Sequence, residues 1–176
     1  MKSSAARSIQ LKYKFTGKNI KLISRRQRLP NGDLKNVEMI SHPGAVCVAA
    51  FLDPKRIVFL RQYRQVPRSY LYELPAGTLD EKEDFLTCAR RELREETGYT
   101  AKEWTKVGRT YPLPAYSDEQ IIIYKAKNLT LAETDRDADE IIEVLPMSLS
   151  QVKKLFSKGK IIDAKTICAL TFCGIL

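Results

Sequence analysis

One stretch of this sequence restricts the fold more than any other: residues 84–98, which read DFLTCARRELREETG. At about 100° per residue, its apolar side chains fall on a single stripe about 100° wide, made of Phe85, Leu86, Ala89 and Leu93. Gly98 supplies a left-handed stop of the kind that ends many helices. We therefore expect one amphipathic helix from about Asp84 to Thr97.

Segments of strand-like sequence lie on both sides of this helix. Alternating or β-rich runs, separated by turn sequences at 30–33 and 53–55, occupy residues 9–15, 21–29, 34–41, 45–51 and 56–63. We expect them to form a mostly antiparallel sheet. After a loop that follows LYELPAG at 71–77, further strands are expected at about 104–110, 120–127 and 141–145, and helices at about 149–158 and 163–173. This order favours an α/β sandwich over a doubly wound Rossmann sheet, whose GxGxxG signature the sequence also lacks.

The chain has 176 residues, which is enough for one domain with a full hydrophobic core and at most a small appendage. The His-Pro-Gly sequence at 42–44 interrupts the strand pattern. We therefore expect an N-terminal β segment over residues 1–41 and a main domain over residues 42–176.

The longest apolar run, AVCVAAFL at 45–52, is too short to cross a bilayer, and the first residues, MKSSAARS, lack the apolar stretch of a secretory signal. We therefore expect a cytoplasmic protein that is not bound to a membrane. The four cysteines contain no CxxC pair, so neither a zinc site nor a set of disulfides is indicated.

The net charge of +9 is unevenly distributed along the chain. Residues 1–64 contain 14 Lys and Arg against 3 Asp and Glu, whereas residues 65–176 contain 16 against 18. This distribution suits an anionic ligand that is also held through a cation bound by carboxylates, and phosphate with a divalent metal fits that description. Nucleic acid is a less suitable partner, because the sequence has neither an aromatic RNP-like run nor a basic stripe at helical spacing.

Three glutamates break the pattern of the expected helix. Glu92, Glu95 and Glu96 lie at i, i+3 and i+4, so they share one strip that overlaps the buried side. Like charges at this spacing repel by a few tenths of a kcal/mol per exposed pair, and partial burial increases the cost. Two explanations are open: a bound Mg²⁺ or Mn²⁺, which prefers carboxylate and carbonyl oxygens, or salt bridges to the arginines at 90, 91 and 94.

The sequence around these glutamates favours the metal. The fixed positions, in order, are Gly77, Glu83 after five residues, Arg91-Glu92-Leu93 after seven more, Glu95-Glu96, Gly98 and Tyr99. This spacing resembles the signature GX5EX7REUXEEXGU of the Nudix hydrolases at every fixed position. The resemblance implies a Nudix-type α/β/α sandwich with a mixed sheet, preceded by a small N-terminal antiparallel β segment.

Motifs outside the signature point to one branch of that family. RQYR at 61–64, ELPAG at 73–77 and Pro114, sixteen residues after Gly98, are similar to the ADP-ribose pyrophosphatase and nucleoside diphosphate sugar hydrolase branch. The resemblance then covers about residues 37–145.

The resemblance implies roles for the signature residues. A Mg²⁺ or Mn²⁺ ion would be held by the backbone carbonyl of one residue and the carboxylates of three others: Ala76, Glu92, Glu95 and Glu96. Glu83 would be a more peripheral ligand or an anchor for the helix start. Arg91 would orient the glutamates by an ion pair. Gly77 would serve a tight turn and Gly98 the helix end.

The same resemblance implies substrate-binding residues. Arg64, and with it Arg61, would bind the diphosphate through paired hydrogen bonds. Glu73 and Pro114 are also assigned to substrate binding. Members of this branch typically form a homodimer through an N-terminal β segment that reaches the partner's site, a role that suits the basic stretch through Arg28.

A general base would activate the attacking water. In this branch it is often a glutamate on a late loop, and ETDRDADEIIEV at 133–144 is the acidic loop of this chain. Glu140 is the preferred residue over Asp139 and Glu143. The DEDE-like run typical of the branch reads DADE here, so Glu95 is the alternative base.

The implied function is metal-dependent hydrolysis of the pyrophosphate bond of ADP-ribose or a related nucleoside diphosphate sugar, giving a nucleoside monophosphate and a sugar phosphate. Relatives that prefer ADP-ribose commonly read SPG where this chain has LPA at 113–115, so other sugar nucleotides are open. Two alternatives are a pyrophosphohydrolase acting on RNA 5′ ends or nucleoside triphosphates, and a non-catalytic nucleotide-sugar sensor.

Overall fold

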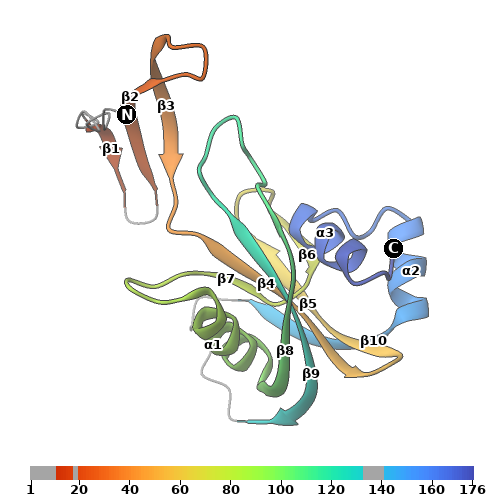
Figure 1. Ribbon diagram of the computed structural model, residues 1–176. Helices are drawn as coiled ribbons and strands as arrows, with labels where there is room; N and C mark the ends of the chain where they lie inside the picture. The colour runs from red at the N-terminus through yellow and green to blue at the C-terminus, as the bar shows by residue number, and fades with distance from the viewer. Residues whose placement is uncertain (1–10, 18–19, 133–140) are drawn as a thin grey trace. The chain divides into compact units, whose positions relative to one another are not determined.

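A computed structural model describes residues 11–17, 20–132 and 141–176 of the protein (Figure 1). Of these residues, those up to position 42 together with 113–119 form one compact unit, and those of 43–112 together with the described residues after 119 form a second. The stretch 113–119, which the sequence-based division assigns to the main domain, thus groups with the N-terminal strands.

The first unit is a three-stranded antiparallel sheet in the order β1-β2-β3. Its strands are β1 (Leu11–Thr16), β2 (Lys21–Arg28) and β3 (Leu34–Ser41). The stretch 113–119 is fastened to the end of β3, where the N–H of Ile40 donates to the carbonyl of Tyr116 at 2.8 Å and Ser117 Oγ donates to the carbonyl of Ile40 at 3.1 Å. The small N-terminal antiparallel sheet is confirmed.

The second unit is built on a mixed sheet in the order β10-β5-β4-β9-β8, with β6 paired to β5 and β7 paired to β4. The described strand pairs are antiparallel except for β4 with β9, which is parallel. The strands are β4 (Ala45–Asp53), β5 (Arg56–Arg64), β6 (Ser69–Glu73), β7 (Ala76–Thr78), β8 (Tyr99–Thr110), β9 (Ile121–Leu131) and β10 (Ile142–Ser148).

Helices cover both faces of this sheet (Figure 1). One face carries α1 (Phe85–Thr97), and the other carries α2 (Leu149–Ser157) and α3 (Ala164–Phe172). Successive side chains of a strand point to opposite faces, so a strand covered on both faces must be apolar throughout. β4 meets this requirement: Val46 and Val48 pack with Leu93 of α1, and Cys47 and Ala49 pack in the cluster on the α2 and α3 side. The expected α/β/α sandwich is confirmed.

The helix expected from the sequence is α1, and its ends have clear causes. Asp84 is the N-cap, because its carboxylate accepts hydrogen bonds from the N–H groups of Leu86 and Thr87 at 2.9 and 3.1 Å. Gly98 has φ of 71°, and its N–H donates to the carbonyl of Arg94 at 2.8 Å. The left-handed glycine stop is therefore confirmed.

Two features of the strands differ from expectation. β8 begins at Tyr99, directly after the helix, rather than at about residue 104. Its first half lies at the edge of the sheet and contains no buried residue and no regular alternation of burial, so it gives only a weak strand signal. β6 and β7 are only five and three residues long, and strands this short are recognisable only through the partners they pair with. None of the described helices is long and apolar enough to cross a bilayer.

Candidate active site

The short strand β7 and the last turns of α1 meet in the second unit. Pairing with β4 fixes β7, because Val46 lies opposite Gly77 and Cys47 opposite Ala76. A Cβ built on Gly77 would lie 1.9 Å from Oε1 of Glu92. Glycine therefore lets the strand backbone and the Glu92 carboxylate occupy this space together.

Glu96 is buried at the same junction. Its side chain is 3% exposed, and its Oε2 accepts a hydrogen bond from the backbone N–H of Ala76 at 2.9 Å. Burial of a carboxylate costs free energy even when the group is hydrogen-bonded. Packing alone would therefore not select an acid at this position, which indicates a functional role.

The guanidinium of Arg91 lies among the glutamates. Its Nε and Nη2 donate to the two oxygens of Glu83, each at 3.0 Å, and its Nη2 also donates to the carbonyl of Thr78 in β7 at 3.1 Å. Its Nη1 donates to Glu92 at 2.7 Å and to Glu95 at 3.0 Å. Arg91 therefore ties the loop before the helix, and β7, to two of the helix glutamates.

These contacts keep Glu83 and Arg91 charged. The hydrogen bonds from Arg91 are the main cause that lowers the pKa of Glu83, and those to Glu83 are the main cause that raises the pKa of Arg91. Glu83 Oε2 also accepts from the N–H of Asp80 at 3.0 Å. Glu83 is thus an anchor for Arg91 at the helix start, while Asp84 caps the helix itself.

The donor set at this junction suits a hard divalent cation. Carboxylates of Glu92, Glu95 and Glu96, with the backbone of Ala76, supply the oxygens that Mg²⁺ and Mn²⁺ prefer. Within the described ranges, no three acidic, histidine or cysteine side chains point at one place closely enough to enclose a metal. Arg91 holds Glu92 and Glu95, and the Ala76 N–H holds Glu96. The residue types fit a cation, which would compete with Arg91 for the first two carboxylates.

A second charged cluster joins β5 to β6. Glu73, at the end of β6, is 1% exposed. Its Oε1 accepts from Nε of Arg64 at 2.8 Å, and its Oε2 accepts from Nη2 of Arg64 at 2.7 Å. This is the paired geometry of an arginine fork on a carboxylate. The Arg64 side chain is 37% exposed, so Arg64 can contact a ligand while Glu73 lies behind it.

Lys165 of α3 completes this cluster. Its Nζ donates to Oε2 of Glu73 and to Oδ1 of Asp163, the second at 3.0 Å. Sequence reasoning missed this residue, because Lys165 lies 92 positions after Glu73 and belongs to no motif. The only nearby signal in the sequence is Asp163, the N-cap residue of α3, which indicates where the helix begins but not what Lys165 contacts.

The two clusters act on each other electrostatically. The hydrogen bonds to Glu73 are the main cause that raises the pKa of Arg64, and the negative charge of Glu96 adds to it. The guanidinium of Arg64 is therefore close enough to the carboxylate of Glu96 for their charges to attract each other. A ligand that carries several negative charges and also binds a metal ion, such as a diphosphate, suits a site that has an arginine beside a cluster of carboxylates.

Comparison with known proteins assigns the family, because a model of the NUDIX domain matches residues 41–170 of the chain. The chain belongs to the Nudix family. It is 38% identical over 174 residues to an ADP-ribose pyrophosphatase of Bacillus subtilis (strain 168), across 98% of this chain and 94% of that protein. It is 33% identical over 168 residues to a methanol dehydrogenase activator of Bacillus methanolicus, across 94% and 91%.

A solved structure shares the fold of this Nudix chain. It is described as the crystal structure of an ADP compounds hydrolase, and it matches with a TM-score of 0.79 over 98% of this chain and 95% of that one. The two sequences are 22% identical, so this likeness concerns the fold. The expected Nudix fold is confirmed.

The two arginines of the RQYR motif contact different partners. Arg61 pairs with Glu143 of β10 at 3.4 Å, and its guanidinium lies 4.0 Å from the centre of the Tyr70 ring. Three positions separate Arg61 from Arg64, so the alternation of a strand sends them to opposite faces of β5. The structure does not bring Arg61 to the Glu73 cluster.

The sequence also predicts Arg28, Pro114 and Glu140, with Asp139 as a weaker alternative to Glu140, for the Nudix site. Arg28 and Pro114 belong to the first unit. Glu140 and Asp139 lie outside the described residues. Among the acids that the structure does describe, Glu95 is the candidate base in direct contact with the signature residues.

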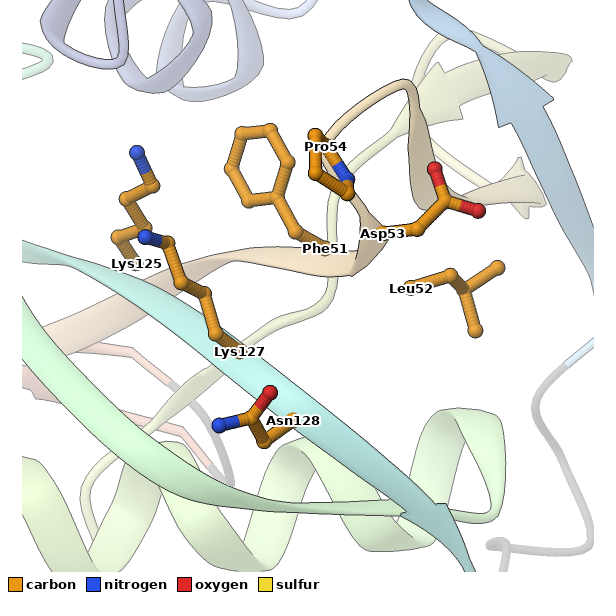
Figure 2. A pocket seen from close by; sticks show the side chains of 7 residues that line it. All are labelled: Phe51, Leu52, Asp53, Pro54, Lys125, Lys127 and Asn128. Carbon is orange, nitrogen blue, oxygen red and sulfur yellow. The ribbon is translucent and has the colours of Figure 1, made fainter.

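A recess of about 320 Å³ lies at the other end of β4, and Figure 2 shows the side chains that line it. Lys125 and Lys127 of β9 line it, and the Lys125 ammonium lies 4.9 Å from the centre of the Phe51 ring. Its acidic residue, Asp53, is paired with Arg56 at 2.6 Å. With one carboxylate, which is already paired, this recess lacks the ligands for a divalent cation, so the junction of α1 and β7 is the candidate Nudix site.

Acid should weaken the Nudix core through Glu73. Burial by itself raises the pKa of Glu73, but hydrogen bonds and positive charges from Arg64 and Lys165 outweigh it, so the pKa is lowered from the ordinary value of 4.5. Such a group contributes stability that is complete above the unfolded-state pKa and is lost as pH falls through the folded-state pKa. We expect the Tm to drop below about pH 4.5, and to drop less steeply in Glu73→Gln.

Differential scanning calorimetry from pH 7 down to pH 3 measures this slope. The Glu73→Gln variant starts from a lower Tm at neutral pH, and the two Tm values should converge at low pH. Parallel curves for the two proteins would show that the Glu73 cluster does not contribute to acid stability.

Proposed function

We propose that this protein is a metal-dependent pyrophosphatase that cleaves ADP-ribose or a related nucleoside diphosphate sugar into a nucleoside monophosphate and a sugar phosphate. The observation that carries the proposal is the close approach of Glu92 to Gly77, beside the buried carboxylate of Glu96. The similarity to an ADP-ribose pyrophosphatase over nearly the whole chain supports this substrate class.

The carboxylates have a direct chemical purpose in this reaction. A diphosphate resists attack because its oxygens are negative. Mg²⁺ or Mn²⁺, when bound, neutralises that charge and makes water more acidic. Glu92, Glu95, Glu96 and the Ala76 carbonyl would hold the ion. Arg91 keeps two of these carboxylates in position and compensates their charge when no cation is present.

Arg64 would bind the diphosphate itself. Glu73 occupies its Nε and Nη2, which leaves the Nη1 N–H groups for a phosphate oxygen. An arginine held in this way is already oriented before the substrate arrives, so less side-chain entropy is lost on binding. Pro114 would make a further contact with the substrate, whereas Arg61, which lies on the other face of β5 and pairs with Glu143, is not assigned to the diphosphate.

Removal of a proton from the attacking water needs a general base. Glu140 is the preferred residue from the sequence, and Glu95 is the alternative. Glu95 is 24% exposed and hydrogen-bonded to Arg91 at 3.0 Å. An acid in this position can reach solvent while its orientation is fixed.

We further propose that the protein is a cytoplasmic homodimer joined through its first unit, with Arg28 reaching the partner's substrate. Phe15 and Leu34 are 59% and 49% exposed on that unit, and such apolar side chains suit an interface. Light scattering should give twice the mass of the chain, and a monomer would refute the dimer.

The test of the function is phosphate release, coupled to a phosphomonoesterase, from ADP-ribose, GDP-mannose, ADP-glucose, NADH and nucleoside triphosphates. Each substrate is assayed with Mg²⁺, with Mn²⁺ and with EDTA. We expect metal-dependent release from the diphosphate sugars, with little release in EDTA.

Other outcomes would replace the proposal. Cleavage of triphosphates alone would indicate a pyrophosphohydrolase, and the activity would then be assayed on RNA with a 5′ triphosphate. Binding of ADP-ribose without any turnover would indicate a non-catalytic sensor.

A further inference from the structure

We propose that Lys165 is a positioning residue for substrate binding: it holds the carboxylate of Glu73, which in turn orients Arg64 toward the diphosphate. The inference rests on the proposed role of Arg64 in this Nudix enzyme. It gives the C-terminal helix α3 a function in the site, although α3 lies far beyond the Nudix signature in sequence.

The contacts around Glu73 support this chain of action. The Glu73 side chain is buried, at 1% exposure. Arg64 donates to both of its oxygens, at 2.8 and 2.7 Å, and Lys165 donates to Oε2 as well. Two bonds from one flat guanidinium set the plane of the carboxylate. The third bond, from a different element, fixes that plane relative to the rest of the protein.

Lys165 is itself held firmly. Asp163 accepts from Lys165 through Oδ1 at 3.0 Å and from the N–H of Thr166 through Oδ2 at 3.0 Å. The Oγ1 of Thr166 in turn accepts from the N–H of Leu74 at 2.9 Å. The first turn of α3 is therefore hydrogen-bonded to two adjacent residues, Glu73 at the end of β6 and Leu74 after it. These contacts fix the position of the Lys165 ammonium relative to Glu73.

A lysine here also changes how strongly Glu73 engages Arg64. If Arg64 were the single cationic partner of the buried Glu73 carboxylate, the negative charge of Glu73 would offset most of the positive charge of Arg64. Arg64 would then attract an anionic ligand less strongly. Lys165 shares the negative charge of Glu73. More of the charge on the half-exposed Arg64 is then available to a phosphate oxygen, which is the atom that the proposed substrate presents.

The experiment is steady-state kinetics with ADP-ribose on Lys165→Met and Lys165→Arg. Loss of the lysine should raise KM about tenfold, with kcat changed by less than about twofold. Arginine should restore most of the affinity, because its guanidinium can donate to the same oxygen. The matched control is Lys127→Met, a lysine in the exposed recess of Figure 2, which should leave KM unchanged.

A double-mutant cycle separates positioning from general structure. In an Arg64→Ala background, Lys165→Met should have no further effect on KM, because the residue through which it acts is gone. A tenfold loss that persists without Arg64, or a loss in kcat alone, would overturn the proposal. Should Lys165→Met fail to fold, Lys165→Gln keeps a hydrogen-bond donor without the charge and is measured in its place.

Binding of ADP-ribose in EDTA, measured by calorimetry, gives a second readout that needs no turnover. Weaker binding by Lys165→Met, relative to Lys127→Met, would support the positioning role even if the wild-type protein proved not to hydrolyse ADP-ribose. Equal binding by the two variants would refute it. Failure of the wild type to cleave any substrate refutes the proposed function instead.

Discussion

Glu92→Gln is expected to lower kcat by at least about a hundredfold, equivalent to roughly 2.7 kcal/mol in activation free energy. Glutamine keeps the shape of the side chain but replaces an anionic oxygen by an amide, which is a poor ligand for a hard dication. Glu92 Oε1 lies 2.7 Å from Nη1 of Arg91, and Arg91 retains Glu83 and Glu95 as partners. We therefore expect the fold to persist.

The measurement is kcat for ADP-ribose across a series of Mg²⁺ concentrations, with the Tm recorded on the same samples. Glu81→Gln is the matched control, because Glu81 is an exposed acid in the loop before α1, and it should behave as the wild type. If Glu92→Gln reached wild-type kcat at saturating Mg²⁺, Glu92 would not be a ligand needed in the transition state. A loss explained by unfolding would show as a large fall in Tm.

Gly77→Ala should reduce kcat/KM by about tenfold to a hundredfold with little change in stability. The added Cβ would lie 1.9 Å from Oε1 and 2.0 Å from Cδ of Glu92, so the carboxylate must move. The obstructed atoms are the end of a flexible side chain, which can rotate away without disturbing the backbone. We expect the free energy of unfolding in urea to change by about 1 kcal/mol or less.

Gly108→Ala provides a matched control for this steric test. A Cβ on Gly108 would lie 2.8 Å from the ring of Phe172, so it too pushes the end of a side chain, but one that is 49% exposed and outside the candidate site. Full activity in Gly108→Ala and loss in Gly77→Ala would assign the effect to Glu92. Full activity in both would mean that the carboxylate does not need its present position.

The two substitutions test the same site from opposite sides. Glu92→Gln changes the charge of the helix side chain, and Gly77→Ala changes the space that the strand leaves for it. If both lower activity while the fold is kept, the function depends on the contact between α1 and β7, not on the helix alone.

Sequence alone determined much of what is local in this protein. The apolar stripe and Gly98 located α1 to within one residue at each end, because capping and helical periodicity depend on neighbours in the chain. The apolar, β-rich run at 45–51 predicted a strand, and β4 occupies Ala45–Asp53. The spacing from Gly77 to Tyr99 identified the family, which the NUDIX match confirms.

Tertiary structure alone decided what depends on distant partners. The parallel pairing of β4 with β9, the short strands β6 and β7, and the grouping of 113–119 with the first unit have no local signal. Arg61 and Arg64 belong to the same RQYR motif, but they point to opposite faces of β5. Arg61 therefore pairs with Glu143, and Arg64 pairs with Glu73. Lys165 reaches Glu73 across 92 residues, because contacts of a buried charge are set by which elements pack together, and no pattern within either segment encodes that packing.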